Sequence, residues 1–172
     1  MFLIPDGDGA EHPQTHYEKL INCEEHAHLK LGEPNVAFLF RVAALQEQGR
    51  QIIGTCFIPT VQGRLRHMFE WMMEEMLGSV PDFLFVLDHD WWFHASPLER
   101  EILMFHEMMH AGQAKDRWGS PRFNKDSGKP VWAIRGHDVE EFTATVSRYG
   151  AWQPEIASFV AACNQTPKFN HD

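Results

Sequence analysis

The stretch His106-Glu107-Met108-Met109-His110 reads H-E-x-x-H, a pattern typical of zinc-dependent enzymes that activate water. Residues four positions apart lie on one face of a helix, so His106 and His110 can direct two imidazole nitrogens at one metal ion. Glu107 lies one position further round the helix, where it can take a proton from a water on the metal. A catalytic zinc keeps one coordination position open for that water and lowers its pKa to about 7.

The residues before this stretch predict a capped helix of about four turns. Ser96 suits the N-cap, Pro97 the first helical position, and Glu99 completes a capping box. Gly112 is expected to end the helix. The predicted inner face carries apolar residues at helical spacing: Leu98, Ile102, Phe105 and Met109. The chain has 11 histidines, so a solvent-facing histidine pair on an ordinary helix is the alternative. A capped, half-buried helix favours the metal site.

Composition predicts a single domain over residues 1–172, since a chain of this length with 44% hydrophobic content can bury one core. A net charge of −9 argues against bulk electrostatic binding to DNA or RNA. The scattered cysteines, Cys23, Cys56 and Cys163, form no C-x-x-C pair and suggest a reducing, cytoplasmic compartment. Residues 1–10 lack the features of a signal peptide, and no apolar run approaches the ~18 residues of a membrane span.

The first part of the chain mixes helix and strand signals. The expected elements are a short helix from a capping box at Thr15 and Glu18, a core helix over residues 36–44 ending by Gly49, and a strand over residues 51–59. His26 and His28 lie beside Glu24 and Glu25 and could form a second metal site. Because alternate residues do not share a helix face, a polar helix end or a loop is favoured there.

A methionine-rich segment, residues 64–77, predicts an amphipathic helix. Its apolar residues recur at helical spacing: Leu65, Met68, Phe69, Met72, Met73, Met76 and Leu77. Packing in the core is the favoured role of this face, and an adaptable partner surface is the alternative. Residues 82–88 form a continuous apolar run between two aspartates and predict a buried strand. The aromatic cluster at residues 91–93 either lines a substrate groove or caps the core.

The chain after Gly112 is irregular. Turn signals separate residues 122–123 from residues 131–134, and the two segments are expected to pair as a hairpin. The last strong helix is predicted to start at an Asp138 N-cap and to end at Gly150. Glu141 would close its capping box, with Phe142, Val146 and Tyr149 on the inner face. Residues 164–172 are expected to form a frayed tail.

Two histidines hold zinc poorly, so a third ligand is expected from outside the H-E-x-x-H helix. The candidates are His137, Glu140 and Glu141. Both glutamates fall in the first turn of the last predicted helix, where carboxylates already have a role in capping and in the helix dipole. That role does not account for His137, which is the favoured ligand. Either glutamate could instead accept a hydrogen bond from a ligand histidine.

The chain resembles the putative phage metallopeptidase family over most of residues 24–152. The shared stretches are Glu24 to Leu29, Ala37 to Arg41, Asp82 to Val86, His106 to His110, and Ile134 to Phe142 with Tyr149-Gly150. H-E-x-x-H followed by His-x-x-x-x-Phe is also similar to the SprT-like zinc proteases, whose third ligand is a histidine, and this supports His137. Against the family pattern, residues 64–77 look like an inserted amphipathic helix, and Ala27 stands where proline is frequent.

The resemblance implies a small α+β zincin-like domain, with helices packed on a short β-sheet and H-E-x-x-H on the active-site helix. Zn²⁺ would be held by His106, His110 and His137, and Glu107 would act as general base in hydrolysis of a peptide or protein substrate. By fold analogy, the strand at residues 83–87 could align an extended peptide. The expected location is the cytoplasm, that of a bacterial host if a phage encodes the chain.

Two alternatives remain from the sequence. The first is a non-catalytic phage or bacterial protein that binds or regulates a partner, with a structural zinc site and a methionine-rich partner surface. The second is a metal-dependent hydrolase of a non-peptide amide, because the zinc chemistry is the same. An exchangeable water on the zinc would favour an enzyme over the first alternative. A structural zinc site is closed by four protein ligands and leaves no position for such a water.

Overall fold

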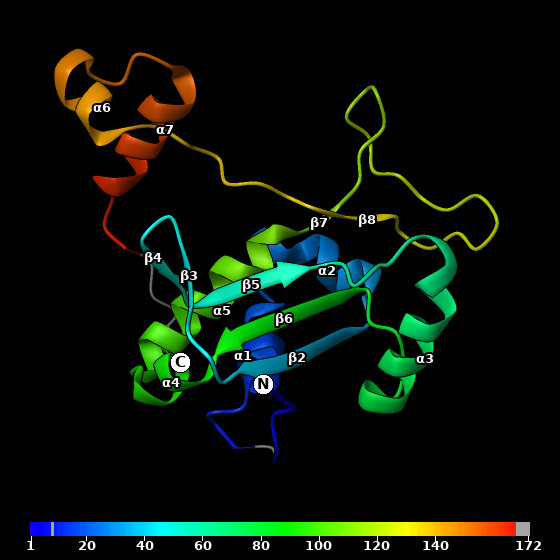
Figure 1. The fold of residues 1–172 in the computed structure, drawn as a ribbon. Helices are drawn as coiled ribbons and strands as arrows, with labels where there is room; N and C mark the ends of the chain where they lie inside the picture. Colours follow the sequence, from blue (N-terminus) through cyan, green and yellow to red (C-terminus); the bar gives the residue numbers. More distant parts are fainter. Residues whose placement is uncertain (8, 168–172) are drawn as a thin grey trace. The chain divides into compact units, whose positions relative to one another are not determined.

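The computed structural model describes residues 1–7 and 9–167. The chain divides into two compact units, Met1–Arg135 and Gly136–Asp172, which are described separately (Figure 1). The prediction of one domain over residues 1–172 stays a prediction. Of the predicted frayed tail, residues 168–172 lie outside the described residues. Within the part of the chain that the structure describes, no helix is long and apolar enough to cross a membrane.

A four-stranded mixed sheet forms the centre of the first unit (Figure 1), and its strand order is β1-β2-β6-β5. Its strands are β1 (Phe2–Leu3), β2 (Val36–Arg41), β5 (Gly54–Phe57) and β6 (Phe83–Asp88). The two inner strands, β2 and β6, run parallel, with Phe38 opposite Phe85. β1 and β5 are antiparallel edge strands. Every residue of β6 is buried, which confirms the strand predicted from the apolar run.

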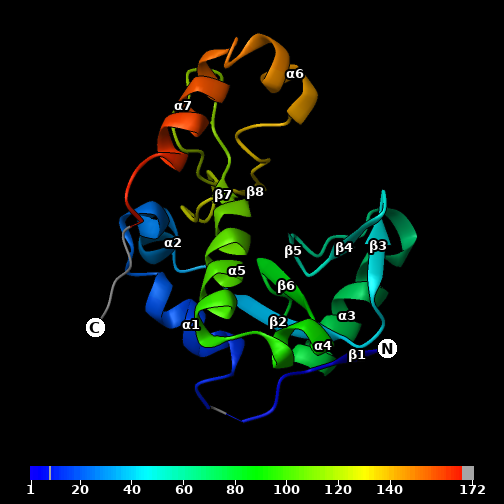
Figure 2. The same ribbon diagram turned by 90° about the vertical axis from the view of Figure 1, so that its left-hand side faces the viewer.

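Helices cover both faces of this sheet (Figure 2). On one face, α1 (Pro13–Leu20) and α5 (Pro97–His110) bury Tyr17, Met104 and Met108 against Phe38 and Phe85. On the other face, Leu77 at the end of α3 (Arg66–Leu77) packs against a cluster made by alternate residues of β2 and β6. Successive side chains of a strand point to opposite faces, so the two inner strands supply both layers of the core. The small α+β fold predicted from the sequence is confirmed.

The prediction of a core helix over residues 36–44 is wrong. This segment forms β2 and then leads into an exposed hairpin of β3 (Leu45–Glu47) and β4 (Arg50–Ile52). Gln48 and Gly49 form its turn, both with positive φ, which suits a tight two-residue hairpin turn. A short apolar run fits a buried strand as well as a helix, and parallel pairing with β6 decided the outcome. The strand predicted over residues 51–59 is divided between β4 and β5.

α5 begins as predicted, with the reciprocal capping box between Ser96 and Glu99. Its predicted inner face is wrong, because Leu98 and Ile102 are about half exposed while Leu103, Met104 and Met108 are buried. The stripe of α5 that packs on the sheet is shifted by one to two positions from the predicted one. Tertiary packing decides which stripe is buried. α5 ends at His110, and Ala111 already begins β7 (Ala111–Gln113).

The aromatic cluster at residues 91–93 belongs to α4 (His89–His94) and caps the core through Trp92. Trp92 is fully buried, and its indole N–H donates to the backbone oxygen of Glu11 over 2.8 Å. The first helix starts earlier than predicted, because His12 rather than Thr15 is its N-cap. Residues 24–32 form the short helices η1 (Glu24–His26) and α2 (Ala27–Gly32), in line with the favoured polar helix end.

The methionine-rich segment forms η2 (Gly63–Leu65) and α3, as predicted, but most of its expected core face is exposed, and only Met73 and Leu77 pack into the core. Only Met73 among the residues of α3 is buried. The predicted hairpin of residues 122–123 with 131–134 is reduced to an isolated bridge between Phe123 and Pro130. β8 (Trp132–Ile134) pairs instead with β7, so the chain after α5 returns to the end of that helix.

The second unit contains α6 (Thr143–Tyr149) and α7 (Pro154–Cys163). Phe142 is the N-cap of α6, so the predicted start at Asp138 is wrong by about one turn. The Glu141 carboxylate accepts hydrogen bonds from the Phe142 backbone N–H over 2.7 Å and from the Trp152 indole over 3.1 Å. Gly150 ends α6 with φ of 74°, as its position predicted.

Candidate metal centre

His106 and His110 project from the last turn of α5 and bring two ring nitrogens together. Their Nε2 atoms lie 3.3 Å apart, with the ring planes inclined by 80°. Two nitrogens bound to one tetrahedral zinc at 2.0–2.1 Å are separated by about 3.3 Å. The donor pair therefore fits zinc both in ligand type and in spacing.

The backbone of Arg135 orients His110. The Arg135 carbonyl oxygen lies 2.7 Å from His110 Nδ1, and the Arg135 N–H donates to the His110 carbonyl over 2.8 Å. A carbonyl only accepts, so Nδ1 carries the proton and Nε2 keeps its lone pair for a metal. Such a hydrogen bond behind a ligand histidine fixes both the tautomer and the ring orientation.

His137 follows Arg135 by two residues and is tethered to the same helix end. Two residues span at most about 7 Å of extended chain, so His137 stays close to the anchored Arg135. The ligand atoms of His106, His110 and His137 all lie within 4.8 Å of one another, and the three histidines could hold a metal ion. Neither Glu140 nor Glu141 belongs to this group, and hydrogen bonding lowers the pKa of Glu141, chiefly through the Phe142 N–H.

Glu107 lies on the buried side of α5, next to strand β5. Its side chain is only 3% exposed, and Oε2 makes no hydrogen bond with any described residue. Burial raises the pKa of Glu107 to about 7, while the backbone N–H of Cys56 acts in the opposite direction. A carboxylate with a pKa near neutrality can both accept and release a proton at neutral pH.

Gly54 provides the space for this carboxylate. A Cβ atom at residue 54 would lie 2.4 Å from Glu107 Oε1 and 2.8 Å from its Cδ. Real Cβ atoms essentially never approach so closely, so a side chain at this position would displace the carboxylate. Sequence reasoning missed Gly54, because it is far from H-E-x-x-H in the chain and only the packing of β5 against α5 brings the two together.

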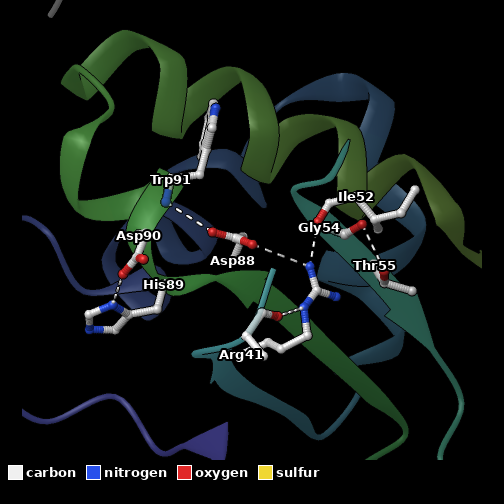
Figure 3. A network of polar contacts seen from close by, with 9 residues as sticks. Arg41, Ile52, Gly54, Thr55, Asp88, His89, Asp90 and Trp91 are labelled. Carbon is white, nitrogen blue, oxygen red and sulfur yellow. Dashed lines mark hydrogen bonds and ion pairs between the residues drawn. The ribbon is translucent and has the colours of Figure 1, made fainter. Parts of the chain in front are cut away.

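A buried polar network holds the segment that leads into Gly54 (Figure 3). The Arg41 guanidinium lies 3.5 Å from the Asp88 carboxylate and donates to the carbonyls of Ile52 and Ala43. Asp88 in turn accepts from the Trp91 N–H over 3.0 Å, which caps α4. The ends of β2 and β6, the start of α4 and the β4–β5 connection are thereby tied together. The sequence signals this network only by a charged residue at the end of each apolar strand, Arg41 in β2 and Asp88 in β6.

No second metal site that includes His26 or His28 is found among the described residues. Neither belongs to a group of three or more potential ligands within the described residues. His28 Nε2 lies 2.8 Å from the carbonyl oxygen of Ala111, the residue after His110. His26 is fully buried with its ring 4.7 Å from that of Phe105, and burial lowers its pKa to about 4.

Comparison with known proteins agrees with this geometry. A family model described as putative phage metallopeptidase matches residues 9–164. The chain belongs to this family. The match includes every histidine of the candidate centre and confirms the resemblance seen in the sequence. No curated protein and no solved structure matches the chain. Membership indicates a metal-dependent peptidase, and the three histidines supply a plausible set of metal ligands.

Proposed function

We propose that this protein is a zinc-dependent metallopeptidase that hydrolyses peptide bonds with Glu107 as general base. The observation that carries the proposal is the pair of histidine nitrogens 3.3 Å apart, with a buried carboxylate on the residue next to one of them. Family membership supports a peptide or protein substrate.

His106, His110 and His137 would hold the zinc, a metal that neutral imidazole nitrogens bind well. When bound, zinc would polarise the scissile carbonyl and lower the pKa of water. The Arg135 carbonyl would keep His110 in the tautomer that presents Nε2.

Glu107 would take a proton from the attacking water as the water oxygen bonds to the carbonyl carbon. It would then release that proton to the leaving nitrogen as the C–N bond breaks, giving a carboxylic acid and an amine. Burial raises the pKa of Glu107, which makes its carboxylate a stronger base for the first transfer. Gly54 and the Cys56 N–H would keep the carboxylate in place between the two steps.

The prediction that the strand at residues 83–87 aligns a substrate peptide is wrong. β6 is buried and already pairs on both sides, with β2 and with β5, so it has no free edge for a peptide. We place the substrate at β5 instead. β5 is the edge strand that lies against α5, and its outer edge pairs with no other strand of the described residues. An extended peptide that added to this edge would pass beside Glu107 with its main chain aligned by hydrogen bonds.

The test is Glu107→Gln, with Glu101→Gln on the same helix as the matched control. Both proteins are assayed for zinc content and for cleavage of a random peptide library by mass spectrometry. Glu107→Gln should keep about one zinc per chain and lose cleavage by about 10²-fold or more, whereas Glu101→Gln keeps both. Undiminished cleavage by Glu107→Gln would remove this residue from the mechanism.

A non-catalytic binding protein is the second candidate, and the exposed methionines of α3 favour it. It predicts that the zinc-loaded wild-type chain cleaves no peptide of the library. It also predicts a zinc without an exchangeable water, which cobalt substitution and visible spectroscopy detect through the coordination number.

A further inference from the structure

Helix α3 leaves a broad apolar surface exposed on the first unit. We call it the α3 face and define it by Leu65, Met68, Trp71, Met72 and Met76, which recur at intervals of three and four residues. These side chains are between 40% and 58% exposed. The adjoining flank of the helix, with Met73 and Leu77, already packs inward. The apolar arc of α3 is therefore wider than the part that the first unit covers, and an uncovered apolar patch of this kind is typical of an interaction surface.

The charges of this segment are arranged against the helix dipole. Arg64 and Arg66 lie at its N-terminal end, Glu74 and Glu75 lie in its last turn, and the first turn has no acidic residue. Acidic residues are stabilising near a helix N-terminus and basic residues near the C-terminus, so this order is unfavourable within one chain. Arg66 pairs with Glu70 over 2.7 Å. Arg64, Glu74 and Glu75 form no ion pair with any described residue.

We propose that the α3 face binds the α3 face of a second copy of this chain, with the two helices antiparallel. This arrangement places the basic end of each helix beside the acidic end of the other and opposes the two dipoles. Arg64 and Glu75 are separated by about three turns and therefore lie on one side of the helix, next to the apolar residues. Two-fold symmetry forms the Arg64–Glu75 pair twice. A parallel pair would instead bring like charges together.

The size of the α3 face predicts a reversible dimer. A helix of 12 residues is about 18 Å long, so one helix pair forms a contact at the small end of specific interfaces. Methionine side chains are unbranched and adapt their shape, which suits a surface that is exposed in the monomer and buried in the dimer. Trp71 supplies a large aromatic group at the centre of the contact.

The experiment is sedimentation equilibrium of the full chain over a range of concentrations, with variants Arg64→Glu, Glu75→Arg and the double variant. Each single change turns two attractive pairs into two repulsive ones, so the dimer should weaken about tenfold or more. The double variant restores both pairs with reversed sign and should return the dimer affinity to near the wild-type value. This rescue is specific to the antiparallel arrangement.

Trp71→Ser tests the apolar part, with Trp118→Ser as its control, since Trp118 is also exposed but lies outside α3. Trp71→Ser should abolish the dimer and Trp118→Ser should leave it unchanged. A wild-type chain that stays monomeric up to millimolar concentration overturns the proposal. A dimer that survives Trp71→Ser, or a double charge reversal that restores nothing, overturns it as well.

Discussion

Under the proposed function, the substitution Gly54→Ala should abolish peptide cleavage and leave zinc binding intact. The added methyl would lie 2.4 Å from Glu107 Oε1, 2.8 Å from Glu107 Cδ and 2.9 Å from Leu103 Cδ1. Ordinary van der Waals contact starts near 3.4 Å, so the carboxylate would have to move by about 1 Å. Glu107 is only 3% exposed, so such a movement has to take place among packed atoms.

A displacement of about 1 Å in a reacting group can lower the rate by about 10²-fold. We therefore expect kcat/KM of Gly54→Ala to fall by about 100-fold on a peptide found in the library. Zinc content should stay at the wild-type level, because His106 and His110 lie on the exposed and half-exposed side of α5. Overpacking of this kind should also lower the free energy of unfolding by about 1–3 kcal/mol. The control is Gly9→Ala, where an added Cβ meets no atom within 4 Å.

A double-mutant cycle in urea unfolding tests the same clash without relying on activity. If the methyl displaces the carboxylate, Gly54→Ala should lose most of its destabilising effect when Glu107 is replaced by alanine. An unchanged cost in the Glu107→Ala background, or full activity of a folded Gly54→Ala protein, would show that Gly54 does not position Glu107.

Three further predictions concern the metal, the pH response and the core. His137→Ala should reduce the zinc measured per chain. Glu141→Ala should retain it, because that carboxylate is held by hydrogen bonds within its own unit. If His137→Ala retained its zinc, the third ligand would have to be another residue. His26 has a folded-state pKa near 4, below its unfolded value of 6.5, so the folded state favours the neutral ring. Above pH 6.5 the His26 ring is neutral in both the folded and the unfolded state. As the pH falls from 6.5 towards 4, only the unfolded state takes up the proton, and the free energy of unfolding falls by about 3 kcal/mol. Urea unfolding at several pH values should show this loss in the wild type and a smaller one in His26→Phe. Trp92→Ala should lower the free energy of unfolding by about 3–5 kcal/mol, because the ring is fully buried, whereas the exposed Trp118→Ala should change it by less than about 0.5 kcal/mol.

Local signals in the sequence were sufficient to predict the helix that carries H-E-x-x-H. The Ser96–Glu99 capping box and the spacing of His106 and His110 depend only on residues within one or two turns of each other, and the structure confirms both. Local sequence was also sufficient to predict β6. All six of its residues are buried, so the strand appears in the sequence as an unbroken apolar run. His137 was favoured over Glu140 and Glu141 by a similar argument, because helix capping explained the glutamates and left the histidine unexplained.

The remaining features depend on contacts between segments that are distant in the chain. Residues 36–41 became a strand because β6 offered a parallel partner, and the buried stripe of α5 was chosen by the sheet it packs on. The exposed methionines of α3 show the same limit, since helical periodicity reports an apolar face but not whether anything covers it. Sequence alone was therefore enough to predict the three candidate ligand histidines and the helix that carries two of them. Only the tertiary structure placed Gly54 against Glu107 and Arg135 behind His110, because packing and backbone hydrogen bonds between distant segments leave no periodic trace in the sequence.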